Sequence, residues 1–232
     1  DITLKSRLDT ITPILENGYT ICLPDLRSMG ELSQDDSINH FSHDTDMAFF
    51  SIKLGLPYIG RMVLDAWCVE KSLKALHPNS QIFLVGDSLA KLNPSHIRQD
   101  RLLIDDGLED LQSAESIGPL TTLFLSALEP ECQKTLINGC LSSYGNVFED
   151  FYFYHPISSF VNGIALKLDI PEICLGIAPR KLVLLNSVNA KNQLMQTGSN
   201  EMTKYQKVID LLKKKESTAN SLKIAQGNIK II

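Results

Sequence analysis

Short apolar runs alternate with amphipathic segments along this chain, and this alternation constrains its fold more than any other feature. Residues 81–87 read Gln-Ile-Phe-Leu-Val-Gly-Asp, which is typical of a buried strand, whereas the apolar residues of 60–76 recur at helical spacing. Strands and helices that alternate at this pitch predict an α/β fold, a mostly parallel, doubly wound sheet with helices on both faces. We expect strands near residues 19–24, 81–86, 133–138, 181–186 and within 221–232, and helices near 4–15, 60–76, 119–128 and 200–215.

Composition narrows the function. The chain has 232 residues, 44% of them hydrophobic, which suits a single α/β domain over residues 1–232. The net charge of −5 and the lack of a dense basic cluster argue against nucleic-acid binding, and no apolar run approaches the roughly 18 residues of a membrane span. Five scattered Cys without C-x-x-C spacing predict free thiols, so we expect no metal and no cofactor. The chain starts at Asp1 and shows no signal-like segment, so we expect that it was processed or excised from something longer and assign no compartment.

Several motifs follow one another in the order of a known family. The turn Asp25-Leu26-Arg27-Ser28-Met29-Gly30 follows an apolar run, and Ser142-Ser143-Tyr144, Asp169-Ile170-Pro171-Glu172-Ile173 and Ala178-Pro179-Arg180-Lys181-Leu182 come later. Together they resemble the α/β-hydrolase superfamily, in particular carbohydrate esterases of the acetylxylan esterase and dienelactone hydrolase type. Ser28 stands where that family has its first turn glycine. The resemblance implies a serine carboxylic-ester hydrolase fold.

The resemblance covers only the C-terminal two-thirds of such a domain. Against the family's order, the chain begins at the helix after the third strand and stops at the eighth strand. The family's third strand lies between the fourth and fifth, so either upstream residues supply it or the flanking strands close up directly. Sheet edges left exposed by missing strands favour self-association or contact with an upstream part of a longer parent chain.

Two serines compete as the nucleophile. Ser88, in Gly86-Asp87-Ser88-Leu89-Ala90, directly follows the clearest strand, as a nucleophile elbow requires. Ser116, in Ala114-Glu115-Ser116-Ile117-Gly118, precedes a good apolar helix whose N-terminus supports an oxyanion, although a helix N-cap is the simpler interpretation. We interpret residues 89–113 as an insertion that separates the strand from its helix. It carries a short apolar run at 101–106 and an acidic cluster, interpreted as a solvated loop, at Asp105, Asp106, Glu109 and Asp110.

The acid and base of a catalytic triad are incomplete. In the resembling family an Asp follows the Ala-Pro-Arg strand, but this position is taken by Asn189, and no His follows the last strand. An Asn cannot stabilise an imidazolium, a loss of about 10⁴ in a related triad. His155, in Tyr154-His155-Pro156, is expected to be a rim or core residue, and His40 and His43 beside Asp44 and Asp46 form only a weak metal candidate. If Ser116 is the elbow serine, it lies at the same sheet edge as Ser88 and Asn189, within about 15 Å of Asn189.

Three hypotheses for function follow. The first is an esterase-like domain related to acetylxylan-type esterases that has lost its catalytic residues. The second is an active esterase acting on acetylated carbohydrate or another small ester, with the missing residues supplied by the parent chain. The third is a non-catalytic carbohydrate-binding or structural module, with aromatic side chains that stack on sugar rings near Tyr144, Tyr152, Tyr154 and His155.

Overall fold

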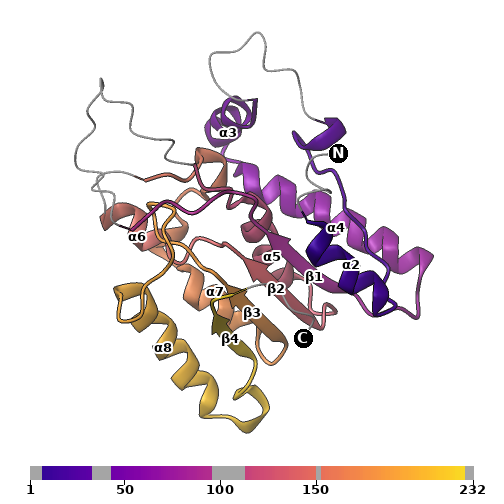
Figure 1. The fold of residues 1–232 in the computed structure, drawn as a ribbon. Coiled ribbons are helices and arrows are strands. Elements are labelled where there is room, and N and C mark those ends of the chain that lie inside the picture. Colours follow the sequence, from indigo (N-terminus) through magenta and orange to yellow (C-terminus); the bar gives the residue numbers. More distant parts are fainter. Residues whose placement is uncertain (1–6, 33–42, 96–112, 150–152, 228–232) are drawn as a thin grey trace.

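Four parallel strands form the centre of the part of the chain that the structure describes. The computed structural model describes residues 7–32, 43–95, 113–149 and 153–227 (Figure 1). The strands are β1 (Phe83–Asp87), β2 (Lys134–Asn138), β3 (Lys181–Leu185) and β4 (Leu222–Ala225), and they pair in the order β1-β2-β3-β4. All three pairings are parallel, so the carboxyl ends of the strands meet at one edge. The predicted α/β architecture and these four strands are confirmed.

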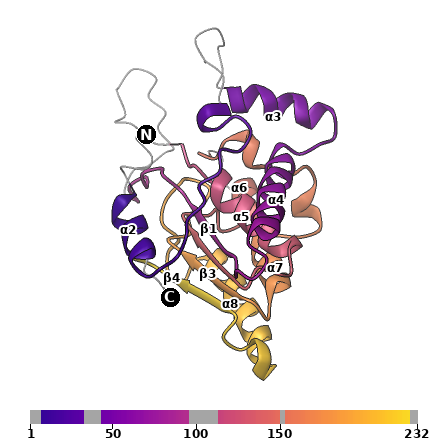
Figure 2. The same cartoon turned by 90° about the vertical axis from the view of Figure 1, so that its right-hand side faces the viewer.

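Helices pack mainly against one face of this sheet. The core cluster of buried residues draws on strands β2, β3 and β4 and on the helices between residues 58 and 213, and its strand residues Ile137, Leu182 and Leu184 are at most 1% exposed. On the opposite face Val85 is 51% exposed, and among the described helices only α2 (Leu8–Glu16) lies on that side, beside β1 (Figure 2). The two layers of helices are therefore unequal. The helices are α2 (Leu8–Glu16), α3 (His43–Lys53), α4 (Tyr58–Leu76), α5 (Ile117–Leu128), α6 (Tyr144–Glu149), α7 (Ile170–Ile177) and α8 (Asn200–Lys213), with 3₁₀ turns η1 (Gly30–Leu32), η3 (Ile157–Ser159), η4 (Ile164–Leu166) and η5 (Glu216–Thr218).

The prediction of a strand at residues 19–24 is wrong. These residues have no strand structure, and the segment runs beside β1 with the Tyr19 and Phe83 rings 5.9 Å apart. An apolar run becomes a strand only where a neighbour accepts and donates its backbone hydrogen bonds. Among the described residues β1 pairs only with β2, so this segment forms no strand ladder with the strand beside it.

Residues 32–56 are polar and rich in Asp, Ser and His, which predicts a surface excursion, but the described part of this stretch is mostly helical. It contains α3, which ends at Lys53 and is joined to α4 by a short turn. The helix has a weak apolar periodicity, which explains why the sequence pattern did not indicate it. Among the described residues no single helix is long and apolar enough to cross a membrane, although Thr45–Lys53 and Tyr58–Leu76 together meet the length and composition criterion across a 103° bend.

In the turn after residue 24, Ser28 adopts a backbone conformation that glycine favours. Ser28 adopts a left-handed φ of 60°, which costs a residue with a Cβ about 1 kcal/mol. The neighbouring Arg27 guanidinium binds Asp65 of α4 through two hydrogen bonds of 2.6 and 2.5 Å. This Arg27 contact also holds the pKa of the Asp65 carboxyl below its usual range. The turn is thereby fixed against α4.

Close contact between α5 and β1 depends on Gly86. A Cβ at Gly86 would lie 2.6 Å from Oγ1 of Thr122 and 3.0 Å from the backbone Cα of Pro119, both in α5. Helix α5 therefore sits on β1 at a distance that only glycine permits, and its first residue follows Ser116 directly.

We expect Gly86→Ala to lower the free energy of unfolding by about 1–3 kcal/mol, because the added methyl group overpacks the interface between α5 and β1. Chemical denaturation measures this loss. Gly176→Ala is the matched control, since Gly176 lies inside α7 with nothing within 4 Å of its Cβ position, and we expect it to gain about 0.5–1 kcal/mol. Equal effects of the two substitutions would contradict the close-contact argument.

Candidate functional site

A row of side-chain hydrogen bonds joins the carboxyl ends of the strands. The Nδ2 group of Asn138 donates to Oδ1 of Asp87 at 2.7 Å, and Nδ2 of Asn186 donates to Oδ1 of Asn138 at 2.8 Å. The backbone N–H of Gly227 then donates to Oδ1 of Asn186 at 3.0 Å. Because the Asp87 carboxylate only accepts, it sets the orientation of each amide in turn. This edge is where open α/β sheets bind ligands.

Ser116, His155 and Asn189 meet beside this edge. The Oγ of Ser116 lies 2.7 Å from Nδ1 of His155, and Nε2 of His155 lies 3.0 Å from the backbone carbonyl oxygen of Asn189. Because a carbonyl only accepts, the ring proton is on Nε2, Nδ1 is the acceptor, and the Ser116 hydroxyl donates to it. One imidazole thus bridges Ser116 and Asn189, which are far apart in the sequence.

Burial decides the electrostatics of this site. Ser116 is 0% exposed and His155 is 4% exposed. Burial lowers the pKa of His155 from its usual 6.5 to about 4, against the opposing effect of its hydrogen bond to the Asn189 carbonyl. The imidazole is therefore neutral at physiological pH, as a general base must be, but it binds a proton weakly.

The side chain of Asn189 does not contact the imidazole. Its Oδ1 accepts from the backbone N–H groups of Lys191 and Gln193 at 2.9 and 3.0 Å, and so closes the turn after β3. The Asn189 carbonyl accepts from the backbone N–H of Asn192 at 3.1 Å within this turn, and from His155 as well. The third member of the arrangement is thus a main-chain oxygen, where the sequence suggested a side chain.

Ser88 has different surroundings. It directly follows β1, and its Oγ accepts from the backbone N–H of Ala90 at 3.4 Å, an ordinary turn contact. Its carbonyl accepts from the Arg7 guanidinium at 2.7 Å. Of the two candidate serines, only Ser116 has an imidazole within hydrogen-bond distance in the described part of the chain.

The strand and helix of the predicted elbow lie side by side although residues 88–116 separate them. The Glu115 carboxylate accepts from the backbone N–H of Leu89 at 2.9 Å, which ties the start of this excursion to its end. Burial raises the pKa of Glu115, with the Leu89 N–H opposing the shift. Most of the predicted insertion 89–113 lies outside the described residues, as do its apolar run 101–106 and its acidic cluster at Asp105, Asp106, Glu109 and Asp110.

Sequence reasoning treated His155 as a rim or core residue and missed its position between the other two groups. Two backbone hydrogen bonds produce that position: Ala114 N–H donates to the Tyr154 carbonyl at 2.6 Å, and Tyr154 N–H donates to the Ala190 carbonyl at 2.8 Å. They align three separate segments immediately beside Ser116, His155 and Asn189. No spacing within one segment of the sequence could have indicated this.

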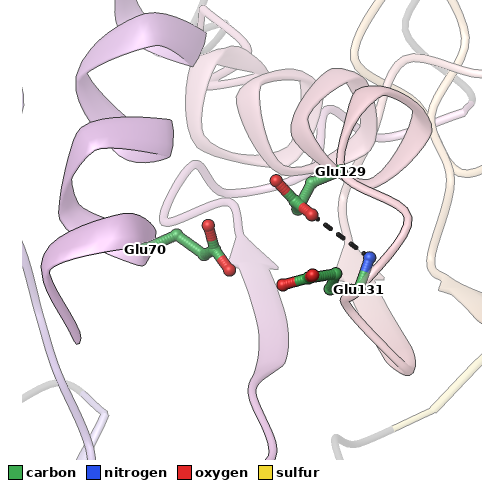
Figure 3. A group of neighbouring side chains, drawn as sticks. All are labelled: Glu70, Glu129 and Glu131. Carbon is green, nitrogen blue, oxygen red and sulfur yellow. Dashed lines mark hydrogen bonds between the residues drawn. The ribbon is translucent and has the colours of Figure 1, made fainter. Parts of the chain in front are cut away.

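A second group of titratable side chains lies at the opposite, amino end of the sheet. Carboxylate oxygens of Glu70, Glu129 and Glu131 lie within 4.8 Å of one another (Figure 3). The Lys74 ammonium lies 2.9 Å from Glu70 and also binds Glu131, and the Lys71 ammonium lies 2.7 Å from Glu129. Because two ammonium groups sit among the carboxylates, we interpret this group as an ion-pair network that fastens α4 to the start of β2.

The remaining features are the weak histidine metal candidate and the five cysteines. His40 and the side chains of His43 and Asp44 lie outside the described structure. All five cysteines are free; Cys132, Cys140 and Cys174 are buried, while Cys22 and Cys68 are exposed. Burial raises the pKa of Cys132 to about 11, so this thiol stays protonated.

Comparison with known proteins adds a likeness of fold. The chain resembles the crystal structure of a "putative acetyl xylan esterase" from Bacteroides fragilis NCTC 9343, with a TM-score of 0.62 and 14% sequence identity. The likeness covers 92% of this chain and 48% of that one, so this chain spans about half the length of the esterase. The chain therefore has an α/β fold like that of this esterase structure. No protein-family model and no curated protein matches the chain.

Protonation of His155 should make folding stability depend on pH. Because the folded-state pKa of about 4 lies below the unfolded value of 6.5, the unfolded chain binds the proton more readily between these values. We expect stability to fall by about 3 kcal/mol as pH drops from 6.5 to 4, beyond the change shown by His155→Gln. Urea unfolding of both proteins across this range measures the difference. Parallel pH profiles would show that the imidazole is not held neutral.

The ion-pair interpretation of the acidic group also makes a prediction. Glu70 is 2% exposed, so Lys74→Met should leave a buried charge poorly compensated and lower the free energy of unfolding on the order of 3 kcal/mol. Lys213→Met, at the exposed end of α8, is the control and should cost little. Added Mn²⁺ should leave the melting temperature of the unsubstituted protein unchanged; a rise would contradict the interpretation.

Proposed function

We propose that this chain is an esterase-like α/β-hydrolase domain related to acetylxylan-type carbohydrate esterases. In it, Ser116 accepts the acyl group of small esters with His155 as its general base, and turnover is impaired. One observation carries the proposal: the Ser116 hydroxyl donates to a neutral imidazole that is oriented by the Asn189 carbonyl. The esterase-like fold supports it.

The chemistry follows from these contacts. As Ser116 Oγ bonds to the acyl carbon, its proton passes to Nδ1 of His155, and the imidazolium returns that proton to the departing alcohol. The developing oxyanion is stabilised by backbone N–H groups in the first turn of α5, which have no partner within the helix. Water then hydrolyses the acyl-enzyme by the reverse proton movements.

Two features of the same site lower the expected rate of catalysis. The Asn189 carbonyl orients the imidazole but carries no full charge to stabilise the imidazolium. A pKa of about 4 also means that placing a proton on His155 at pH 7 costs about 4 kcal/mol. Both effects slow proton transfer, so acylation and deacylation are slow even with Ser116 correctly placed.

The proposed carbohydrate-stacking role has less support. Tyr144 is 1% exposed and its hydroxyl donates to the Ser159 carbonyl at 2.8 Å, so it presents no ring face to a ligand. His155 is committed to Ser116 and Asn189, and Tyr152 lies outside the described residues.

The decisive experiment follows acetylation of the protein by p-nitrophenyl acetate. We expect slow release of nitrophenol with acetyl retained on Ser116, detected by peptide mass spectrometry, and loss of both in Ser116→Ala and His155→Ala. Ser88→Ala is the matched control at the same sheet edge and should keep both signals. The rate should rise with pH around 4 and then level off, since His155 loses its proton there. Acetylation that survives Ser116→Ala would overturn the proposal.

A further inference from the structure

Access to the Ser116–His155 pair requires part of the molecule to move. Ser116 is 0% exposed and His155 is 4% exposed, so neither atom of the pair meets an ester in the closed structure. Enzymes with buried sites commonly open a loop or helix for the substrate. The inference below rests on the proposed function, because it concerns access to the same site.

A small apolar cluster separate from the main core lies beside the pair. Its buried members include Ile117, which follows Ser116 directly, and Ala48 of α3; Ile157 of η3, two residues after His155, packs against it. We call this the cover cluster; its buried members are Leu26, Ala48, Tyr58, Met62 and Ile117. It connects α3 to the elements that carry both Ser116 and His155.

Helix α3 is attached to this cluster by little surface. It packs against η3 and α4, and its buried side chains in the described structure are the small Ala48 and Ser51. Of its larger apolar side chains Ile52 is partly buried, whereas Phe49 is 45% and Phe50 61% exposed. Since the free energy of burial scales with apolar area, detaching α3 costs far less than detaching a helix of the main core.

A hinge follows α3. Gly55 has a φ of 71° and nothing within 4 Å of its Cβ position, and it lies between two helices that meet at 103°. The Gly55 and Leu56 N–H groups each donate to α3 carbonyls at 2.9 Å, which ends the helix in a glycine cap. Backbone rotation at Gly55 therefore meets no packed side chain at the glycine itself.

We infer that α3 is a movable cover over the Ser116–His155 site, which turns about Gly55 to admit the ester and excludes water when closed. The buried side chain of Ala48 is the contact that holds α3 against the cover cluster. Phe50 is exposed, so its side chain does not hold α3 in the closed position.

The test measures access to position 116 without relying on catalysis. Ser116→Cys, in a background of Cys22→Ser and Cys68→Ser, is treated with N-ethylmaleimide, and the modified peptide is quantified over time. Adding Ala48→Trp should accelerate modification about tenfold, because an indole overpacks the seat of α3. Adding Phe50→Trp places the same side chain on the outward face of the same helix and should leave the rate unchanged.

Equal rates in all three proteins would overturn the cover, as would acceleration by both Trp substitutions. Hydrogen exchange of the unsubstituted chain provides a second measurement that does not need Ala48→Trp to fold. The amides of residues 48–53 should exchange much faster than those of α5, and equal protection would overturn the inference. Failure of Ser116 acetylation with accelerated thiol modification would reject the proposed function while keeping the cover.

Discussion

The parallel pairing of β1 to β4 is the constraint on which the rest of the described structure depends. It brings Asp87, Asn138 and Asn186 to one edge, where the charge of Asp87 dictates which way each amide points. Parallel strands also need crossover connections, which here are α5, α7 and α8. The helices therefore begin near the carboxyl edge, and the loops at that edge carry Ser116, His155 and Asn189.

Burial acts on the candidate site in two opposing directions. Exclusion of water fixes the ring of His155 between one donor and one acceptor, and so selects a single tautomer. The same exclusion penalises the imidazolium, which has no carboxylate beside it in the described part of the chain. In triads that have a buried Asp, a full negative charge offsets that penalty. Here a carbonyl dipole takes the place of that charge. The imidazole therefore keeps its orientation, but its protonated form is less well stabilised.

Local sequence patterns predicted the strands of the sheet because each is a short apolar run bounded by polar residues. The same rule failed at residues 19–24, where the run is apolar but forms no hydrogen-bonded ladder with β1 beside it. Helix α3 was missed because its apolar residues do not form one stripe, and the larger ones face solvent. Strand formation depends on the neighbour, and neighbours are not visible in a local pattern.

The candidate site was predicted in part. Ser116 was indicated by its place before an apolar helix and Asn189 by its place after a strand, but the role of the Asn189 main chain was not indicated, since every residue has a carbonyl. His155 could be assigned only after folding, because hydrogen bonds between residues 114, 154 and 190 set its position. The resemblance to esterases indicated the fold and left this arrangement unspecified.

The tie between Leu89 and Glu115 has a consequence for how this chain can evolve. Since the excursion leaves and rejoins the fold at nearly one point, its length is decoupled from the placement of Ser116. Doubling the length of a flexible loop costs only about 0.6 kcal/mol in closure entropy. Asn93, Pro94 and Ala114 bond to the segments that carry Asn189 and His155, so insertions and deletions are close to neutral for the elbow only between Pro94 and Ser113. Related chains can differ greatly in size there while keeping the same hydroxyl in the same place.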